Sequence, residues 1–268
     1  MNITDLNLSR QTEEQRMAQD NCIFLARVGS TMYGTTTENS DDDMLGIFMP
    51  TIDYVIGRKR VDTVEFLTNA SDSGIRNKKG DIDYKFYSLT KWFHLAINNN
   101  PNILEILFSP QNCILHETDE WKKIRDNKEL FLSLKSYHSF KGYAFGQMER
   151  LGIKSGNNTG RKDLIALYQY DCKMAAHTFR LYYECIQLLK EQIITMPLPD
   201  RKEILFIKKG GYPGLDGLEK LKVKAKELEV RCDRVYDESK LRHSPDHEGI
   251  SKLQQEILIS YWKKQGVI

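Results

Sequence analysis

The pattern of apolar and polar positions changes its period near residue 88. Before that point, short apolar runs are separated by residues typical of turns. Runs of this kind predict strands, and alternation of apolar and polar side chains within a run places one face of the strand on a core. We therefore expect a short mixed sheet built from "CIFLARVG", "MLGIFMP", "YVIG", "DTVEFL" and "DIDYKFYSL".

From residue 88 onward the spacing of apolar residues is that of helices. In "SLTKWFHLAI" the apolar residues recur every three to four positions. A second helix is expected in "NNNPNILEILFSP", with Pro101 in its first turn. Nearly all of the sequence after residue 118 has the same helical spacing. Loops are expected at "GIKSGNNTG" and "KKGGYPGLDG". The pattern predicts an α+β protein, with a sheet-containing domain at residues 1–112 and an all-helical domain at residues 113–268.

Composition narrows the class of protein. The chain has 268 residues, of which 40% are hydrophobic, and its charged residues of both signs leave a net charge of only +2. Such a charge gives no field for indiscriminate nucleic-acid binding. Five widely spaced cysteines without a C-x-x-C pair argue against a disulfide framework or a zinc ribbon and favour a reducing compartment. With no signal-like start and no run near the roughly 18 apolar residues of a membrane span, we expect a cytoplasmic protein without membrane contact.

The candidate chemistry begins in "RVGSTMYGTTTENSDDDMLGIF". Gly29 and Ser30 are expected to form a turn at the carboxyl end of a strand, where backbone N–H groups and a hydroxyl can hold a phosphate. In a strand that begins near Asp41, Asp41 and Asp43 share a face while Asp42 points away. Paired carboxylates repel each other unless a cation lies between them, and their oxygens suit Mg²⁺.

A third carboxylate is expected from the strand in "DIDYKFYSL", where alternation separates Asp81, Asp83 and Lys85 from the apolar positions. Asp83 is the natural candidate and Asp81 the reserve, and a third acid would allow two metal ions to clamp the attacking and leaving oxygens. Other motifs do not fit. A calcium loop starting at Asp41 would have leucine and isoleucine at ligand positions, and P-loop, dinucleotide, nucleophile-elbow and H-E-x-x-H patterns do not occur.

Four blocks of the sequence occur in a characteristic order. They are "GSTMYGTTTENSDDDMLGIFMP", "DYKFYSLTKWFHLAINNNPNILEILFSP", "YDCKMAAHTFRL" and "MPLPDRKEILFIKKGGYP". Together they resemble the RlaP-like predicted nucleotidyltransferases, also called the RNA repair pathway DNA polymerase beta family, within the DNA polymerase beta superfamily. The likeness spans roughly residues 20 to 215. Asp42 departs from it, because an apolar or aromatic residue is more usual there.

The resemblance implies a minimal nucleotidyltransferase domain followed by helices. It also implies transfer of a nucleoside monophosphate from an NTP with two divalent ions, Mg²⁺ or Mn²⁺. Phosphoryl transfer of this sort needs positioning and charge neutralisation rather than a protein nucleophile. On a helix, Lys173, His177, Arg180 and Glu184 share one face. The cations of that stripe are candidates to contact the triphosphate.

The acceptor is left open by the residues. The first hypothesis is an RNA or DNA end, with RNA, including tRNA, favoured. Separately, the low net charge suits a small or structured acceptor better than long duplex DNA. A second is a protein side chain or a small molecule, which would need the same site. A third is an inactive nucleotide- or nucleic-acid-binding module, against which Asp41 and Asp43 argue, because a binding module has no use for repelling carboxylates.

Overall fold

A computed structural model describes residues 12–38, 40–67, 82–151 and 162–268. The chain packs into two compact units, and each is described by itself. Unit 1 comprises Met1–Ile97, Ile106–Phe131 and Asp246–Ile268, and unit 2 comprises Asn98–Glu105 and Leu132–Pro245. The domain boundary predicted between residues 112 and 113 stays a prediction. The predicted fold class is confirmed, because a mixed sheet is combined with helices that fill most of the second half.

Unit 1 contains the sheet. Among the described residues its five strands lie in the order β3-β4-β2-β1-β5, with β2 and β4 parallel and the other neighbours antiparallel. Its elements, in chain order, are α1 (Glu13–Asp20), β1 (Cys22–Arg27), α2 (Gly29–Tyr33), β2 (Asp42–Phe48), α3 (Ile52–Val55), β3 (Thr63–Leu67), β4 (Ile82–Ser88), α4 (Leu89–Ile97), β5 (Ile114–Glu117), α6 (Asp119–Asp126) and α12 (His247–Lys264).

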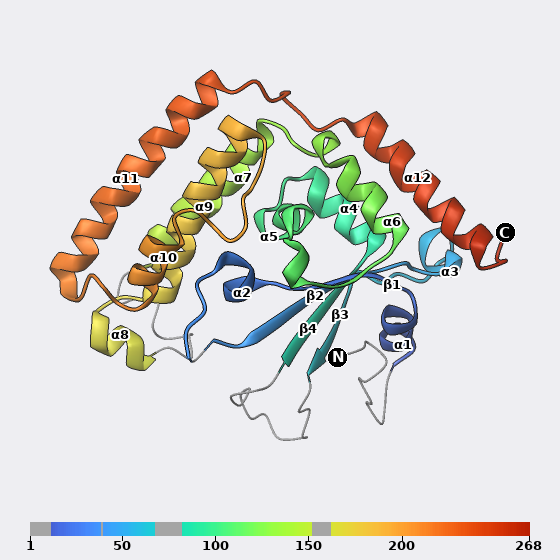
Figure 1. The fold of residues 1–268 in the computed structure, drawn as a ribbon, viewed down its shortest axis with the longest axis horizontal. Coiled ribbons are helices and arrows are strands. Elements are labelled where there is room, and N and C mark those ends of the chain that lie inside the picture. The colour runs from blue at the N-terminus through green and yellow to red at the C-terminus, as the bar shows by residue number, and fades with distance from the viewer. Residues whose placement is uncertain (1–11, 39, 68–81, 152–161) are drawn as a thin grey trace. The chain divides into compact units, whose positions relative to one another are not determined.

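Both faces of this sheet are covered. On one face Phe24 of β1 stacks on Trp121 of α6 at 4.5 Å between ring centroids, and Trp92 of α4 meets the same indole edge-on. On the other face, Met17 and Ala18 of α1 join a core with apolar residues of β1, β2 and β4. Figure 1 shows α4 and α6 on one side of the strands and α1 on the opposite side. Burial of the central strands on both sides explains their continuous apolar runs.

Two elements of unit 1 differ from the sequence predictions. "YVIG" was expected to be a strand, but Tyr54 and Val55 lie in helix α3, with Tyr54 buried and Ile56 exposed. An apolar run of three residues is too short to distinguish the two periods. Strand β5 was not expected, since His116 and Glu117 interrupt its apolar pattern. It is held by antiparallel pairing with β1, which sequence periodicity does not report.

Unit 2 is helical, with α9 at its centre. Helices α7, α10 and α11 all pack against α9, and the chain reaches unit 2 first through α5. The elements are α5 (Pro101–Leu104), α7 (Lys135–Met148), α8 (Lys162–Tyr168), α9 (Cys172–Glu191), α10 (Arg201–Lys208) and α11 (Gly214–Glu238). The described chain also contains short 3-10 segments at Glu105–Phe108, Gln111–Cys113 and Lys128–Leu130, and from Ile106 onward these residues belong to unit 1.

The local sequence explains where α9 begins and ends. The Asp171 side chain accepts a hydrogen bond from the Met174 backbone N–H at 3.0 Å, as an N-cap residue does. Gln192 ends the helix in the left-handed conformation, with φ of 57°. Thirteen residues of this helix are buried, so it presents apolar side chains on several sides at once. None of the helices within the described ranges is both long enough and apolar enough to cross a bilayer.

Candidate active site

The acidic residues of the opening segment lie at the start of β2. Asp42 and Asp43 are the first two residues of this strand, Asp41 precedes it directly, and all three are exposed. Successive residues of a strand point to opposite faces. Asp42 therefore lies on the face opposite to Asp43, as expected from the sequence, and continued alternation assigns Asp41 to the face of Asp43.

Asp83 lies beside Asp43. The two residues are register partners in the parallel pairing of β2 with β4, so their side chains project from the same face of the sheet. Neighbouring strands run about 4.8 Å apart, which brings the two carboxylates within reach of one cation. Asp83 is half-buried, whereas Asp43 is exposed. The reserve candidate, Asp81, lies outside the described residues.

Asp42 has different surroundings from Asp43. Register pairing places it beside Ile82, and its negative charge acts on Tyr84 two residues along β4. Burial raises the pKa of the Tyr84 phenol, Arg27 opposes the rise, and Asp42 adds to it. The extra aspartate therefore belongs to a local environment with Arg27 and Tyr84, on the face that α1 covers farther along the strands.

Gly29 lies directly against the carboxylate of Asp43. A Cβ added at Gly29 would come within 2.8 Å of Asp43 Oδ2, and the residue has a φ of +63°. The Val28 backbone N–H also donates to the Asp43 carbonyl oxygen at 2.9 Å. A side chain at position 29 would both strain the backbone and displace the carboxylate. The glycine is thus explained by its conformation and by its closeness to Asp43.

Gly29 and Ser30 open a short helix rather than the turn that the sequence predicted. They are the first residues of α2, whose N-cap residue, Val28, provides no side-chain hydrogen bond. The Ser30 carbonyl accepts hydrogen bonds from Thr35 and Thr36, which fold the following segment back on the helix. The difference arises because Met32 is buried and anchors the residues after Ser30 as one helical turn. Phosphate binding by Gly29 and Ser30 stays a prediction.

The carboxylates of Asp41, Asp43 and Asp83 are of the kind that binds divalent metal ions. Three carboxylates supply the hard oxygen ligands that Mg²⁺ or Mn²⁺ takes. Asp43 and Asp83 lie on the same face at the start of neighbouring strands, and Gly29 carries no side chain that would crowd the Asp43 carboxylate. These features fit a divalent cation. Within the described ranges, however, no three Asp, Glu, His or Cys side chains are already gathered as a complete ligand set. Asp41, Asp43 and Asp83 as metal ligands therefore stay a prediction.

The predicted stripe on unit 2 lies on α9, and its members differ in exposure. Lys173 and His177 are half-buried, whereas Arg180 is only 4% exposed and Glu184 is fully buried. Arg180 makes an ion pair with Glu105 and a second one with Glu184, at 3.0 Å in the latter case. Its guanidinium also donates to Asn102 Oδ1 at 3.1 Å. Arg180, which was expected to meet the triphosphate, is thus already paired with two buried carboxyl groups.

His177 completes this cluster. Its Nε2 lies 2.9 Å from a guanidinium nitrogen of Arg180, and the Tyr143 ring meets the imidazole edge-on at 5.3 Å between centroids. Arginine has no acceptor, so Nε2 must accept, and the imidazole carries its proton on Nδ1. Burial raises the pKa of Glu184, as does the nearby Glu105, although Arg180 opposes both. Nucleotide contacts by Lys173, His177 and Arg180 stay predictions.

Sequence reasoning missed Glu105 and Asn102 as partners of Arg180. The signal was present in "NILEILF", where one glutamate interrupts an otherwise apolar run. A carboxylate at such a position is buried with the helix that carries it and requires a cationic partner. Glu105 is 2% exposed. Which cation would pair with it depends on tertiary packing, and the sequence did not show that.

Comparison with known proteins identifies the family of this chain. The family model described as "RlaP: RNA repair pathway DNA polymerase beta family" matches residues 3–254. The chain belongs to the RNA repair pathway DNA polymerase beta family. The resemblance carried by the four sequence blocks is thereby confirmed, and the match extends beyond residues 20 to 215 at both ends. The family description refers to a polymerase of the DNA polymerase beta type.

Two individual proteins are similar to this chain. An uncharacterized 38.9 kDa protein of Enterobacteria phage T4, from the nrdC-mobD intergenic region, is 31% identical over 140 residues, which cover 51% of this chain and 40% of that protein. The match therefore spans less than half of the relative's length. A nucleotidyltransferase-like protein from Exiguobacterium sibiricum has 11% identity and a TM-score of 0.29, covering 96% of this chain and 77% of that one. Family membership rests on the sequence match.

Proposed function

We propose that this protein is a nucleotidyltransferase that transfers a nucleoside monophosphate from an NTP to a hydroxyl group at an RNA end. The observation that carries the proposal is the pairing of Asp43 with Asp83 on adjacent parallel strands, next to a glycine whose backbone lies against the Asp43 carboxylate. The family description, which refers to RNA repair, supports RNA as the acceptor.

The reaction follows from the chemistry of the substrates. The acceptor oxygen forms a bond to the α-phosphorus of the NTP, the bond from that phosphorus to the bridging oxygen breaks, and pyrophosphate leaves. The acceptor proton passes to solvent or to a nearby base. Asp41, Asp43 and Asp83 are the residues that would hold two Mg²⁺ or Mn²⁺ ions, and such ions supply charge neutralisation at the attacking and leaving oxygens. No protein nucleophile is needed.

The remaining residues of the proposal bind and position the nucleotide. The backbone at Gly29 and the hydroxyl of Ser30 are placed at the start of α2, where N–H groups lack helical partners and suit phosphate oxygens. On unit 2, Lys173 is a half-buried cation and a candidate to bind the triphosphate. Arg180, held by two carboxylates, is better suited to position His177 and the helix than to bind phosphate directly.

The test is a labelling experiment. The protein is incubated with Mg²⁺, one α-labelled NTP at a time, and RNA, DNA or lysate proteins as acceptor, and the labelled species is identified. We expect label on RNA that Asp43→Asn abolishes and Asp42→Asn largely retains, because only Asp43 pairs with Asp83. Label on a protein or a small molecule, and not on RNA, would show that the acceptor belongs to that other class. Labelling that Asp43→Asn leaves unchanged would overturn the assignment of the site.

A further inference from the structure

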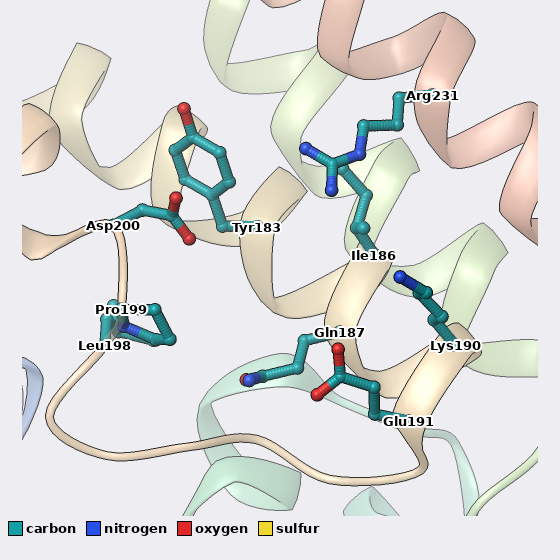
Figure 2. A pocket seen from close by; sticks show the side chains of 9 residues that line it. All are labelled: Tyr183, Ile186, Gln187, Lys190, Glu191, Leu198, Pro199, Asp200 and Arg231. Carbon is teal, nitrogen blue, oxygen red and sulfur yellow. The ribbon is translucent and has the colours of Figure 1, made fainter.

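A small cavity lies in unit 2, and its lining does not include Arg180, His177 or their partners. It is bounded by the second half of α9, the segment before α10, and α11 (Figure 2). Its volume is about 140 Å³. A cavity of about 150 Å³ accommodates benzene, so this one takes a ligand of roughly six to eight non-hydrogen atoms. The volume suits a small metabolite.

The wall of this cavity is fixed by specific contacts. Gln187 holds the chain after α9 by two hydrogen bonds to Thr195, one donated by the backbone N–H at 2.7 Å and one accepted by the hydroxyl at 2.9 Å. Leu198, from the same segment, is buried. The Tyr183 hydroxyl donates to Glu203, so the ring is also held in place. The cavity is therefore a defined part of the fold and not a gap in a loose loop.

Charges of both signs line the cavity without joining into ion pairs. Arg231 is close enough to Asp200 to lower the pKa of its carboxyl, yet no ion pair within 4 Å joins these two described side chains. Asp200 is also the N-cap residue of α10 and makes no capping hydrogen bond. Burial raises the pKa of its carboxyl, although Arg231 opposes the rise. The acid is thus set in a place where an added cation would stabilise its ionised form.

The rest of the lining suits an aliphatic linker. Ile186, Leu198 and Pro199 line the cavity between the charged groups. Lys190 and Glu191, both exposed, add one charge of each sign at the α9 side (Figure 2). We propose that the cavity binds a small aliphatic zwitterion, with its ammonium group facing Asp200 and its carboxylate facing Arg231.

The test uses three molecules of similar carbon skeleton. Binding of 4-aminobutyrate, butylammonium and butyrate to the full chain is followed by titration calorimetry and by chemical-shift changes, at concentrations up to the millimolar range. We expect the zwitterion to bind at least about tenfold more tightly than either singly charged analogue, because only it satisfies both groups at once. Equal binding of all three, or no binding of any, would overturn the proposal.

Variants locate the site. Asp200→Asn and Arg231→Gln should each weaken zwitterion binding by about tenfold or more. Matched changes outside the cavity, Asp216→Asn and Lys220→Gln on the exposed surface of α11, should leave it unchanged. Melting curves of all four variants show whether each one folds. Loss of binding in the matched variants, or retention in both cavity variants while they remain folded, would show that the ligand does not bind in this cavity.

Discussion

Two polar constellations were predicted from the sequence, and the structure gives them opposite environments. The aspartates at the start of β2 lie at an exposed end of the sheet, with Asp43 exposed and its neighbour Asp83 half-buried. The stripe on α9 runs inward, so that Arg180 is buried between Glu105 and Glu184. Like charges at an exposed end of a sheet repel one another and would be stabilised by a bound cation, whereas opposite charges in a core stabilise one another. A ligand is proposed for the first arrangement, and internal pairing accounts for the burial of Arg180 in the second.

The largest expected effect concerns the buried cluster. Arg180→Met leaves two carboxylates buried without their cation, which should lower the free energy of unfolding by about 3–5 kcal/mol. Urea denaturation of the full chain measures the change. Lys173→Met removes a half-buried cation from the same helix and should cost much less. If Arg180→Met proves as stable as wild type, the cluster does not hold unit 2 together.

A combined variant sharpens this result. Replacing Glu105 and Glu184 with glutamine in the Arg180→Met background removes the uncompensated charges. The triple variant should therefore recover part of the lost stability, since neutral amides cost less to bury than carboxylates. Absence of any recovery would mean that packing, and not charge, accounts for the loss in the single variant.

The second effect is catalytic. Asp43→Asn should reduce the rate of nucleotide transfer at least about a hundredfold, on the order of 3 kcal/mol, because the transition state loses a carboxylate that neutralises charge. The melting temperature should stay near that of wild type, since Asp43 is exposed. Asp42→Asn, on the opposite face, is the matched control and should lose much less. Equal losses in both variants would contradict the division of the two aspartates between faces.

The third effect tests the contact between α2 and β2. Gly29→Ala places a Cβ within 2.8 Å of Asp43 Oδ2 in a backbone conformation with φ of +63°, so strain of about 1–2 kcal/mol is expected. The displaced carboxylate should lower the transfer rate more than tenfold. Gly142→Ala in α7 is the control, because nothing lies within 4 Å of its added Cβ. A Gly29→Ala enzyme with normal turnover would show that Asp43 tolerates displacement.

The sequence predicted which face of the sheet each aspartate occupies, because the alternation of side chains along a strand depends only on neighbouring residues. The sequence alone separated Asp42 from Asp43 and chose Asp83, and the register of β2 with β4 agrees with that choice. It did not show that a short helix begins at Gly29, which depends on the burial of Met32. Helical spacing likewise showed that Lys173, His177 and Arg180 share a face. It did not show whether that face meets solvent or the core, because α9 is surrounded by other helices and Glu105 comes from a distant segment.

The last expected effect is a gradual change of the free energy of unfolding with pH, which comes from the buried acid Glu184. Burial raises the pKa of Glu184 from 4.5 to about 8, with a further contribution from Glu105. The folded protein then keeps a proton that the unfolded chain releases, so stability should fall as pH rises between about 4.5 and 8. One proton corresponds to at most about 1.4 kcal/mol per pH unit. Urea denaturation across this range measures the slope, and Glu184→Gln should flatten it because the amide does not titrate. A slope that is unchanged in Glu184→Gln would assign the proton to another group and leave Arg180 paired with two ionised carboxylates throughout.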